Sequence, residues 1–198
     1  RIIPSYPSSL RALRVKRKAG NGLAMASIYA QSARQRKTGD TTPMPKIDLN
    51  AIPQTNATGY PAPFDEPVAG RWYRRLAPVS GLTDFAASHV VLKPGAWSSQ
   101  RHWHNGEDEM LIMIAGQATL VEDDGEHIMR AGDIAVWPKG STNGHHVRND
   151  GTEDCVFVAL GGGSRVDTGG GYSDIDMLFT DDGRYTHKDG TPYPAKRV

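Results

Sequence analysis

Two histidines separated by one residue mark the stretch of this sequence with the clearest potential for chemistry. His102 and His104 flank Trp103, and an Asn-Gly pair leads from them to the acidic run 107–109. On a β-strand, side chains alternate between the two faces, so both imidazoles would project to one side and the indole to the other. An Asn-Gly turn can return the chain and place a carboxylate beside the imidazoles. Two imidazoles and a carboxylate that converge on one point form a metal site with coordination positions left open.

The glycines, histidines and acid around this stretch resemble the two sequence motifs of the cupin superfamily. The resemblance covers about residues 80–162 and is specific, because two separate motifs occur in order at a suitable distance. The residues that match the first motif are Gly95, His102, His104, Glu109 and Gly116, and those that match the second are Gly132, Pro138, Lys139, Gly140, His145 and Asn149.

This resemblance implies a metal held by three histidines and one glutamate, namely His102, His104, Glu109 and His145. Four residues separate Gly140 from His145 where the family usually has two, so His146 is an alternative ligand. His145 keeps the family spacing to Asn149 and is therefore preferred. Such ligands suit one divalent transition metal, and Fe, Mn, Ni, Zn, Cu and Co are not distinguished.

The resemblance also implies a class of function. A metal in an apolar interior can bind O₂ or polarise a carbonyl or hydroxyl group. Within cupins this chemistry serves dioxygenases, isomerases and lyases, so we expect a metal-dependent enzyme that acts on a small organic molecule. The alternative is a non-catalytic cupin that binds a ligand or metal as a sensor. The sequence assigns no catalytic residue beyond the metal ligands.

Residues near the ligands that share their inward side are expected to line the substrate pocket, and these are Gln100, Leu111, Met113 and Val147. Their mostly apolar character favours a modestly apolar substrate. The two motifs contain no cluster of arginines, so they offer no clear anchor for a phosphosugar. Leu111 stands where cupin lyases of sulfonium substrates tend to carry a tyrosine, which argues against that reaction.

Glycine and proline punctuate the chain closely enough to favour many short strands. The 198 residues include 22 Gly and 13 Pro, with turn signals at short intervals. About eight or more strands are expected, and the resemblance makes them an all-β double-stranded β-helix, or jelly-roll barrel, with an extended N-terminal arm. The run Met110–Ala115 is entirely apolar, as expected of a strand buried on both faces.

The length of the chain is that of one domain. Differences in composition divide it into segments with different expected structures. Residues 44–79 are rich in proline and are expected to form an extended arm, residues 80–162 the cupin barrel core, and residues 163–198 a tail that packs on the barrel. No run of about 18 apolar residues is present, so no membrane partner is expected. We expect a homodimer, because small cupins often dimerise through a sheet and the apolar run 110–115 would suit burial between two copies.

The first 43 residues differ in charge from the rest. They hold nine Lys or Arg and one acid, which leaves 14 bases and 21 acids in the remainder. The chain begins at Arg1 and Met44 would be a natural start, so residues 1–43 are expected to be a disordered basic leader or a non-native extension. We expect a cytoplasmic location, with organelle targeting by the leader as the lesser alternative. The negative body argues against a nucleic-acid partner and leaves a small-molecule substrate as the expected partner.

Overall fold

The structure is a computed structural model that describes residues 46–163, 169–180 and 182–194. The expectation that residues 1–43 are a disordered basic leader or a non-native extension falls outside these ranges. Within them, almost all regular structure is β-strand. The helical exceptions are α1 (Leu76–Ser80) and the short 3-10 helix η1 (Leu49–Ala51). No helix of the described residues is long and apolar enough to span a bilayer.

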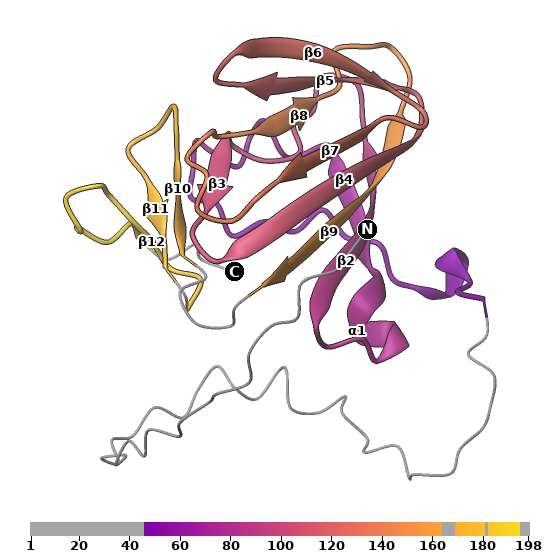
Figure 1. Ribbon diagram of the computed structural model, residues 1–198, viewed down its shortest axis with the longest axis horizontal. Helices are drawn as coiled ribbons and strands as arrows, with labels where there is room; N and C mark the ends of the chain where they lie inside the picture. The colour runs from indigo at the N-terminus through magenta and orange to yellow at the C-terminus, as the bar shows by residue number, and fades with distance from the viewer. Residues whose placement is uncertain (1–45, 164–168, 181, 195–198) are drawn as a thin grey trace, which may run out of the picture. The chain divides into compact units, whose positions relative to one another are not determined.

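A five-stranded antiparallel sheet forms one layer of the fold (Figure 1), with the spatial order β1-β2-β9-β4-β7. In that order the strands are Arg71–Arg75, Phe85–Leu92, Cys155–Gly163, Glu107–Ala115 and Ile134–Trp137. Strands that are distant in the sequence therefore lie side by side, with β9 between β2 and β4.

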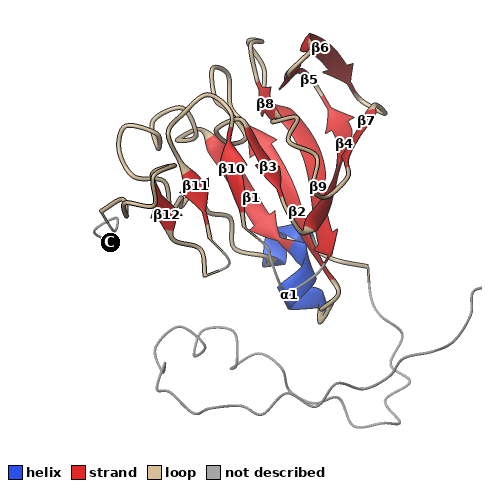
Figure 2. Cartoon of the chain, turned by 60° about the vertical axis from the view of Figure 1, so that its left-hand side comes forward, coloured by secondary structure: helices blue, strands red, loops and turns tan. Residues whose placement is uncertain are grey.

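Two smaller antiparallel sheets meet at the histidines. One has the order β6-β5-β8, with strands Gly125–Arg130, Gln117–Glu122 and His146–Arg148. The other has the order β12-β11-β10-β3, with strands Tyr185–Thr186, Leu178–Phe179, Gly170–Tyr172 and His102–His104. In Figure 2, the tail strands β12, β11 and β10 follow one another from the left towards β3. An isolated bridge between His102 and His145 joins the two sheets, with backbone hydrogen bonds of 3.1 and 2.9 Å.

The main core lies between the five-stranded sheet and the β6-β5-β8 sheet. Leu92, Met113 and Phe157 come from the first, and Leu120 and Val147 come from the second. Each such side chain contributes about 1.5–3 kcal/mol when it is fully buried. The two packed layers confirm the predicted all-β double-stranded β-helix.

The expectation that the strand at Met110–Ala115 is buried on both faces is wrong. Leu111 and Met113 are buried, but Met110 is 40% exposed and Ile114 is 50% exposed. Alternation along β4 accounts for the difference, because only the odd-numbered side chains face the core. Met110, Ile112 and Ile114 form an apolar outer surface on the five-stranded sheet.

The N-terminal arm and the C-terminal tail pack against each other in a second apolar cluster. Tyr60 and Val68 of the arm lie with Tyr172 and Met177 of the tail. The arm also supplies β1, which pairs with β2 along its whole length. The tail supplies β10, which pairs with β3. Both segments are thus built into the sheets that surround the histidines.

Candidate metal centre

Strand β3 carries the first two histidines of the site. Their ring centroids lie 5.0 Å apart, and His102 lies opposite Tyr172 of β10. Trp103, between them, packs on Gly171 of β10, where a Cβ would approach the indole to 2.8 Å. The pairing with β10 therefore seats the indole on the tail and leaves the imidazoles on the other side of the strand.

Glu109 brings the carboxylate of the site from β4, opposite Trp137 of β7. One of its oxygens, Oε2, faces the Nε2 atoms of all three imidazoles. The distances are 2.8 Å to His145, 3.4 Å to His104 and 3.8 Å to His102. The structure thus brings together the four side chains that the cupin motifs named as ligands.

His145 directly precedes β8, and its ring is held by a stacking contact. Its ring lies flat on the indole of Trp137, with centroids 3.9 Å apart and an angle of 7° between the planes. The indole Nε1 donates a hydrogen bond of 2.8 Å to Glu122, which fixes the plane of the ring. This contact orients the imidazole so that its Nε2 reaches Glu109.

The neighbouring His146 has a different environment. Its Nδ1 lies 3.0 Å from the backbone oxygen of Ser99, and its ring meets Trp97 edge to face at 4.6 Å. Burial lowers the pKa of His146, so its imidazole is neutral near pH 7. Because His146 is engaged by these contacts, the geometry favours His145 as the fourth ligand.

The charges of the site match the requirements of a metal ligand set. Burial lowers the pKa of His102 to about 3, against the opposing attraction of Glu109. Burial alone would raise the pKa of Glu109, but the hydrogen bond with His145 and the three imidazoles lower it to about 2. At neutral pH the site therefore offers a carboxylate and a neutral His102 imidazole, the forms that bind metals.

Unpaired ring nitrogens indicate that these residues fit a metal ion. Both ring nitrogens of His104 are buried without a hydrogen-bond partner, as is Nδ1 of His145. Nδ1 of His102 lies 3.1 Å from the backbone oxygen of Gln100, which directs Nε2 into the cluster. Ligand atoms of His102, Glu109 and His145 lie within 4.8 Å of one another, and His104 adjoins them through Glu109. A buried polar atom without a partner costs about 1–3 kcal/mol, and a bound cation would offset that cost.

A cavity of about 460 Å³ opens beside the cluster. Of the four residues that the sequence placed in the substrate pocket, Leu111 and Val147 line this cavity. Met113 lies in the core, and the amide of Gln100 donates to the backbone oxygen of Phe64, so neither contributes to the lining. The lining otherwise mixes serines, tyrosines and apolar side chains, so the cavity offers both polar and apolar contacts to a small molecule.

The cavity also contains residues that the motifs could not reveal. Arg71, Tyr73 and Arg75 line it from β1, which lies outside both motifs. The expectation that a phosphosugar would lack an anchor was based on the two motifs alone. The structure adds Arg71 and Arg75 to the same cavity. The alternation of the three residues along one strand was the available signal, since it places them on one face.

Glu107, the first residue of β4, lies at the edge of the cluster. Its carboxylate lies 3.7 Å from Nδ1 of His104. It also covers Gly161, where a Cβ would collide with the carboxylate. Burial raises the pKa of Glu107, and His104 opposes that effect.

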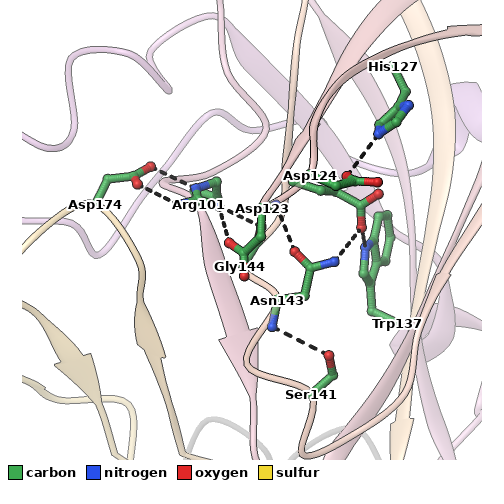
Figure 3. Close-up of polar contacts among 10 residues, drawn as sticks. Arg101, Asp123, Asp124, His127, Trp137, Ser141, Asn143, Gly144 and Asp174 are labelled. Atoms are coloured by element: carbon green, nitrogen blue, oxygen red, sulfur yellow. Dashed lines mark hydrogen bonds and ion pairs between the residues drawn. The ribbon is translucent and has the colours of Figure 1, made fainter.

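A polar network holds the loops around His145 (Figure 3). Arg101 binds Asp174 with two hydrogen bonds of 2.9 and 2.7 Å, and it also pairs with Asp123. Its guanidinium reaches the backbone oxygen of Gly144, the residue before His145. Arg101 therefore ties the tail and the β5–β6 turn to the segment that delivers a ligand.

Figure 3 also shows Asp124 and His127, which with Glu122 form a second group at metal-ligand distances. Asp124 and His127 are exposed and pair with each other at 3.0 Å. Glu122 already accepts hydrogen bonds from Trp137 and Asn143. These hydrogen bonds and the ion pair account for the closeness of the three side chains without a metal ion.

Comparison with known proteins agrees with this geometry. The family described as Cupin domain matches residues 88–161. A crystal structure from Silicibacter pomeroyi, described as a sugar phosphate isomerase from a cupin superfamily, is 37% identical. It aligns over 76% of this chain and 98% of its own length, with a TM-score of 0.71. The chain belongs to the cupin superfamily.

A more distant crystal structure supports the fold alone. It comes from Acidithiobacillus ferrooxidans and is described as a putative sugar phosphate isomerase. It is 23% identical over 65% of this chain and 81% of its own length, with a TM-score of 0.55. No curated protein matches this cupin significantly.

Proposed function

We propose that this cupin is a metal-dependent isomerase that acts on a small sugar phosphate. The observation that carries the proposal is the cluster of three histidines and one glutamate in the wall of a cavity of about 460 Å³. A cavity of this size suits a small molecule. The S. pomeroyi structure, 37% identical and described as a sugar phosphate isomerase, supports the choice of reaction.

The ligand cluster would hold one divalent transition metal through His102, His104, Glu109 and His145. Four protein ligands leave about two positions of an octahedron open for substrate oxygens. When bound, the metal supplies polarisation of a carbonyl or hydroxyl group of the substrate. The stacked Trp137 holds His145 and the backbone contact holds His102, so both imidazoles would be in place for a metal at the wall of the cavity.

The other lining residues would orient the substrate and limit its contact with water. Val90, Leu111 and Phe157 form an apolar side of the cavity. Burial raises the pKa of Tyr60 to about 12 and raises that of Tyr172 well above its usual range. Both hydroxyls therefore stay protonated at neutral pH. The Tyr172 hydroxyl already hydrogen-bonds with Tyr60 and Tyr185, so Tyr60 is the donor that a sugar oxygen could use.

Isomerisation of an aldose to a ketose moves hydrogen between neighbouring carbons and needs no oxidant. The test is to load the protein with Mn²⁺, Fe²⁺, Co²⁺, Ni²⁺, Cu²⁺ or Zn²⁺ and incubate it with aldose and ketose phosphates in D₂O. Proton NMR should show interconversion, with or without deuterium at the exchanged carbon. The His104→Ala variant should lose both metal and turnover, whereas His127→Ala, an exposed histidine, should keep them.

Other outcomes of this experiment would overturn the proposal in specific ways. Stoichiometric metal with tight binding of a sugar phosphate and no turnover would identify a non-catalytic binding cupin. Substrate-dependent oxygen consumption by the iron-loaded protein would identify a dioxygenase. Loss of a leaving group without a change in carbonyl position would identify a lyase.

We also propose that two copies of this chain pair through the outer face of β4 and β7. Met110 lies opposite Val136, and Ile112 lies opposite Ile134, so these four side chains project from one face. Ile134 and Val136 are 60% and 56% exposed. Because the four side chains are uncharged, the same patch on two copies can meet without like-charge repulsion.

A further inference from the structure

The strand β1 presents two guanidinium groups to the cavity of the metal site. Arg71, Tyr73 and Arg75 alternate along it and all line the cavity. The guanidinium carbons of Arg71 and Arg75 lie 5.4 and 5.8 Å from the centroid of the Tyr73 ring. The Tyr73 hydroxyl donates a 3.0 Å hydrogen bond to the backbone oxygen of Ala57, which keeps the ring between them. Two positive charges are thus held on one wall.

These two arginines have no carboxylate counter-ion. In the described part of the chain, Arg101, Arg148 and Arg184 each pair with a carboxylate, whereas Arg71 and Arg75, like Arg74 and Arg130, form no ion pair. Nε of Arg71 is buried and has no hydrogen-bond partner. A half-buried cation with an unpaired donor costs free energy unless an anion or acceptor binds it.

The charge balance of the cavity favours an anion. Glu109 is the one carboxylate among the described residues that line it, and that carboxylate is committed to the three histidines. A divalent metal would add further positive charge beside the two arginines. The cavity therefore complements a ligand with two negative charges.

A short chain of contacts links Arg71 to the metal centre. Its Nη1 donates a 2.6 Å hydrogen bond to the backbone oxygen of Ser98. The next residue, Ser99, places its Oγ 3.2 Å from Nδ1 of His102. A ligand held by the free edge of the Arg71 guanidinium would therefore share the cavity with the open side of the metal site.

We propose that Arg71, assisted by Arg75, binds the phosphate group of the substrate and so sets the specificity of the metal site. The proposal rests on the proposed function and adds the residue that distinguishes a phosphorylated sugar from a free one. The guanidinium of Arg71 offers the N–H groups of its terminal nitrogens that Ser98 does not accept to the phosphate oxygens. The hydroxyls of Tyr60 and Tyr185 are additional donors, and the nearby charge of Arg71 opposes the rise in pKa that burial gives both.

The binding test compares a phosphorylated and an unphosphorylated probe on the metal-loaded protein. Isothermal titration with ribose 5-phosphate, ribose and inorganic phosphate should show that the two phosphates bind at least about tenfold more tightly than ribose. The Arg71→Gln variant should lose that preference, with about tenfold to hundredfold weaker binding of ribose 5-phosphate and unchanged binding of ribose.

Two variants on the same strand provide the controls. Arg74 lies on the opposite face of β1 and donates to the backbone oxygen of Ile52, so Arg74→Gln should keep the preference. Arg75 is exposed, so Arg75→Gln should fold normally and lose a smaller part of the preference. If Arg71→Gln unfolds, this second loss still tests the proposal.

The outcomes separate this inference from the isomerase proposal. Turnover of free sugars as efficiently as sugar phosphates would overturn the role of Arg71 and leave the isomerase standing. A phosphate preference that depends on Arg71, without any turnover, would support the anchor and overturn the isomerase. Phosphate binding that survives in Arg71→Gln but vanishes in His104→Ala would place the anion on the metal and overturn the anchor.

Discussion

The indole of Trp137 lies almost parallel to the imidazole of His145, with 3.9 Å between the ring centroids. Trp137 sits at the end of β7, directly opposite Glu109 of β4. Its Nε1 is fixed by Glu122 at the end of β5. One aromatic side chain thus adjoins two of the candidate ligands, and the position of His145 depends on contacts from β4, β5 and β7.

Removing this aromatic plane should weaken metal binding. We expect Trp137→Leu to lower metal affinity about tenfold to hundredfold, because groups that orient a ligand carry effects of that size. Trp137→Phe keeps a ring against His145 and should lose only a few-fold. Competition with a chromophoric chelator measures both affinities. Equal affinities for Trp137→Leu and the parent protein would contradict a role in orienting His145.

Loss of the Asn149 side chain should lower stability without removing a metal ligand. It is fully buried, and its Nδ2 donates to the backbone oxygens of Leu92 and Glu153, both at 2.8 Å. Its Oδ1 accepts from the backbone N–H of Gly151 at 3.0 Å. Asn149→Ala leaves these groups unpaired and should lower the free energy of unfolding by about 3 kcal/mol in urea denaturation.

The matched control for that measurement is Asn56, an exposed asparagine with one hydrogen bond to the backbone oxygen of Ala69. Asn56→Ala should cost less than about 1 kcal/mol, because water replaces the lost partner. If the two substitutions shifted the urea midpoint equally, the buried hydrogen bonds of Asn149 would not be the cause.

The ion pair between Arg101 and Asp174 should make stability depend on pH in the acidic range. Hydrogen bonds from Arg101 lower the pKa of Asp174 below its usual value of 3.8. A folded-state pKa below the unfolded one gives stability that is complete above about pH 4 and is lost as the pH falls through the folded value. Asp174→Asn should therefore lower the melting temperature by about 2–4 °C at pH 7, for a pair that contributes about 1 kcal/mol.

This difference should shrink as the pH falls below about 4, since Asp174 then becomes neutral in the parent protein as well. Asp182 provides the control, because the guanidinium of Arg184 donates a single hydrogen bond of 2.7 Å to it at an exposed turn. Asp182→Asn should change the melting temperature less at pH 7. A gap for Asp174→Asn that persists unchanged at pH 2.5 would exclude the ion pair as its source.

The sequence was informative where structure follows from local alternation. His102 and His104 could be placed on one face from their spacing alone, and the cupin motifs added Glu109 and His145. The same alternation could not say which face of Met110–Ala115 is exposed, because every residue in that run is apolar. Tertiary packing decides which face is exposed, because other strands cover Leu111 and Met113 and leave Met110 and Ile114 uncovered.

The arginines of the cavity could not be assigned from the sequence for a different reason. Arg71 and Arg75 precede both motifs, and no spacing relates them to the histidines. They reach the cavity because β1 pairs with β2 at the edge of the five-stranded sheet. Strand pairing between distant segments decides such contacts, and hydrophobic patterning does not encode it.

A charge on the outer face of β7 should separate the proposed dimer. Ile134 is 60% exposed beside Val136, and at the centre of a dimer interface a lysine there would be buried without a partner. We expect the parent protein to be a dimer by light scattering after gel filtration, and Ile134→Lys to be a monomer with an unchanged circular dichroism spectrum. Ile128 on β6 is 47% exposed in a different sheet, so Ile128→Lys should remain dimeric. A monomeric parent protein at about 50 µM, or dissociation of both variants alike, would show that this face does not pair two copies.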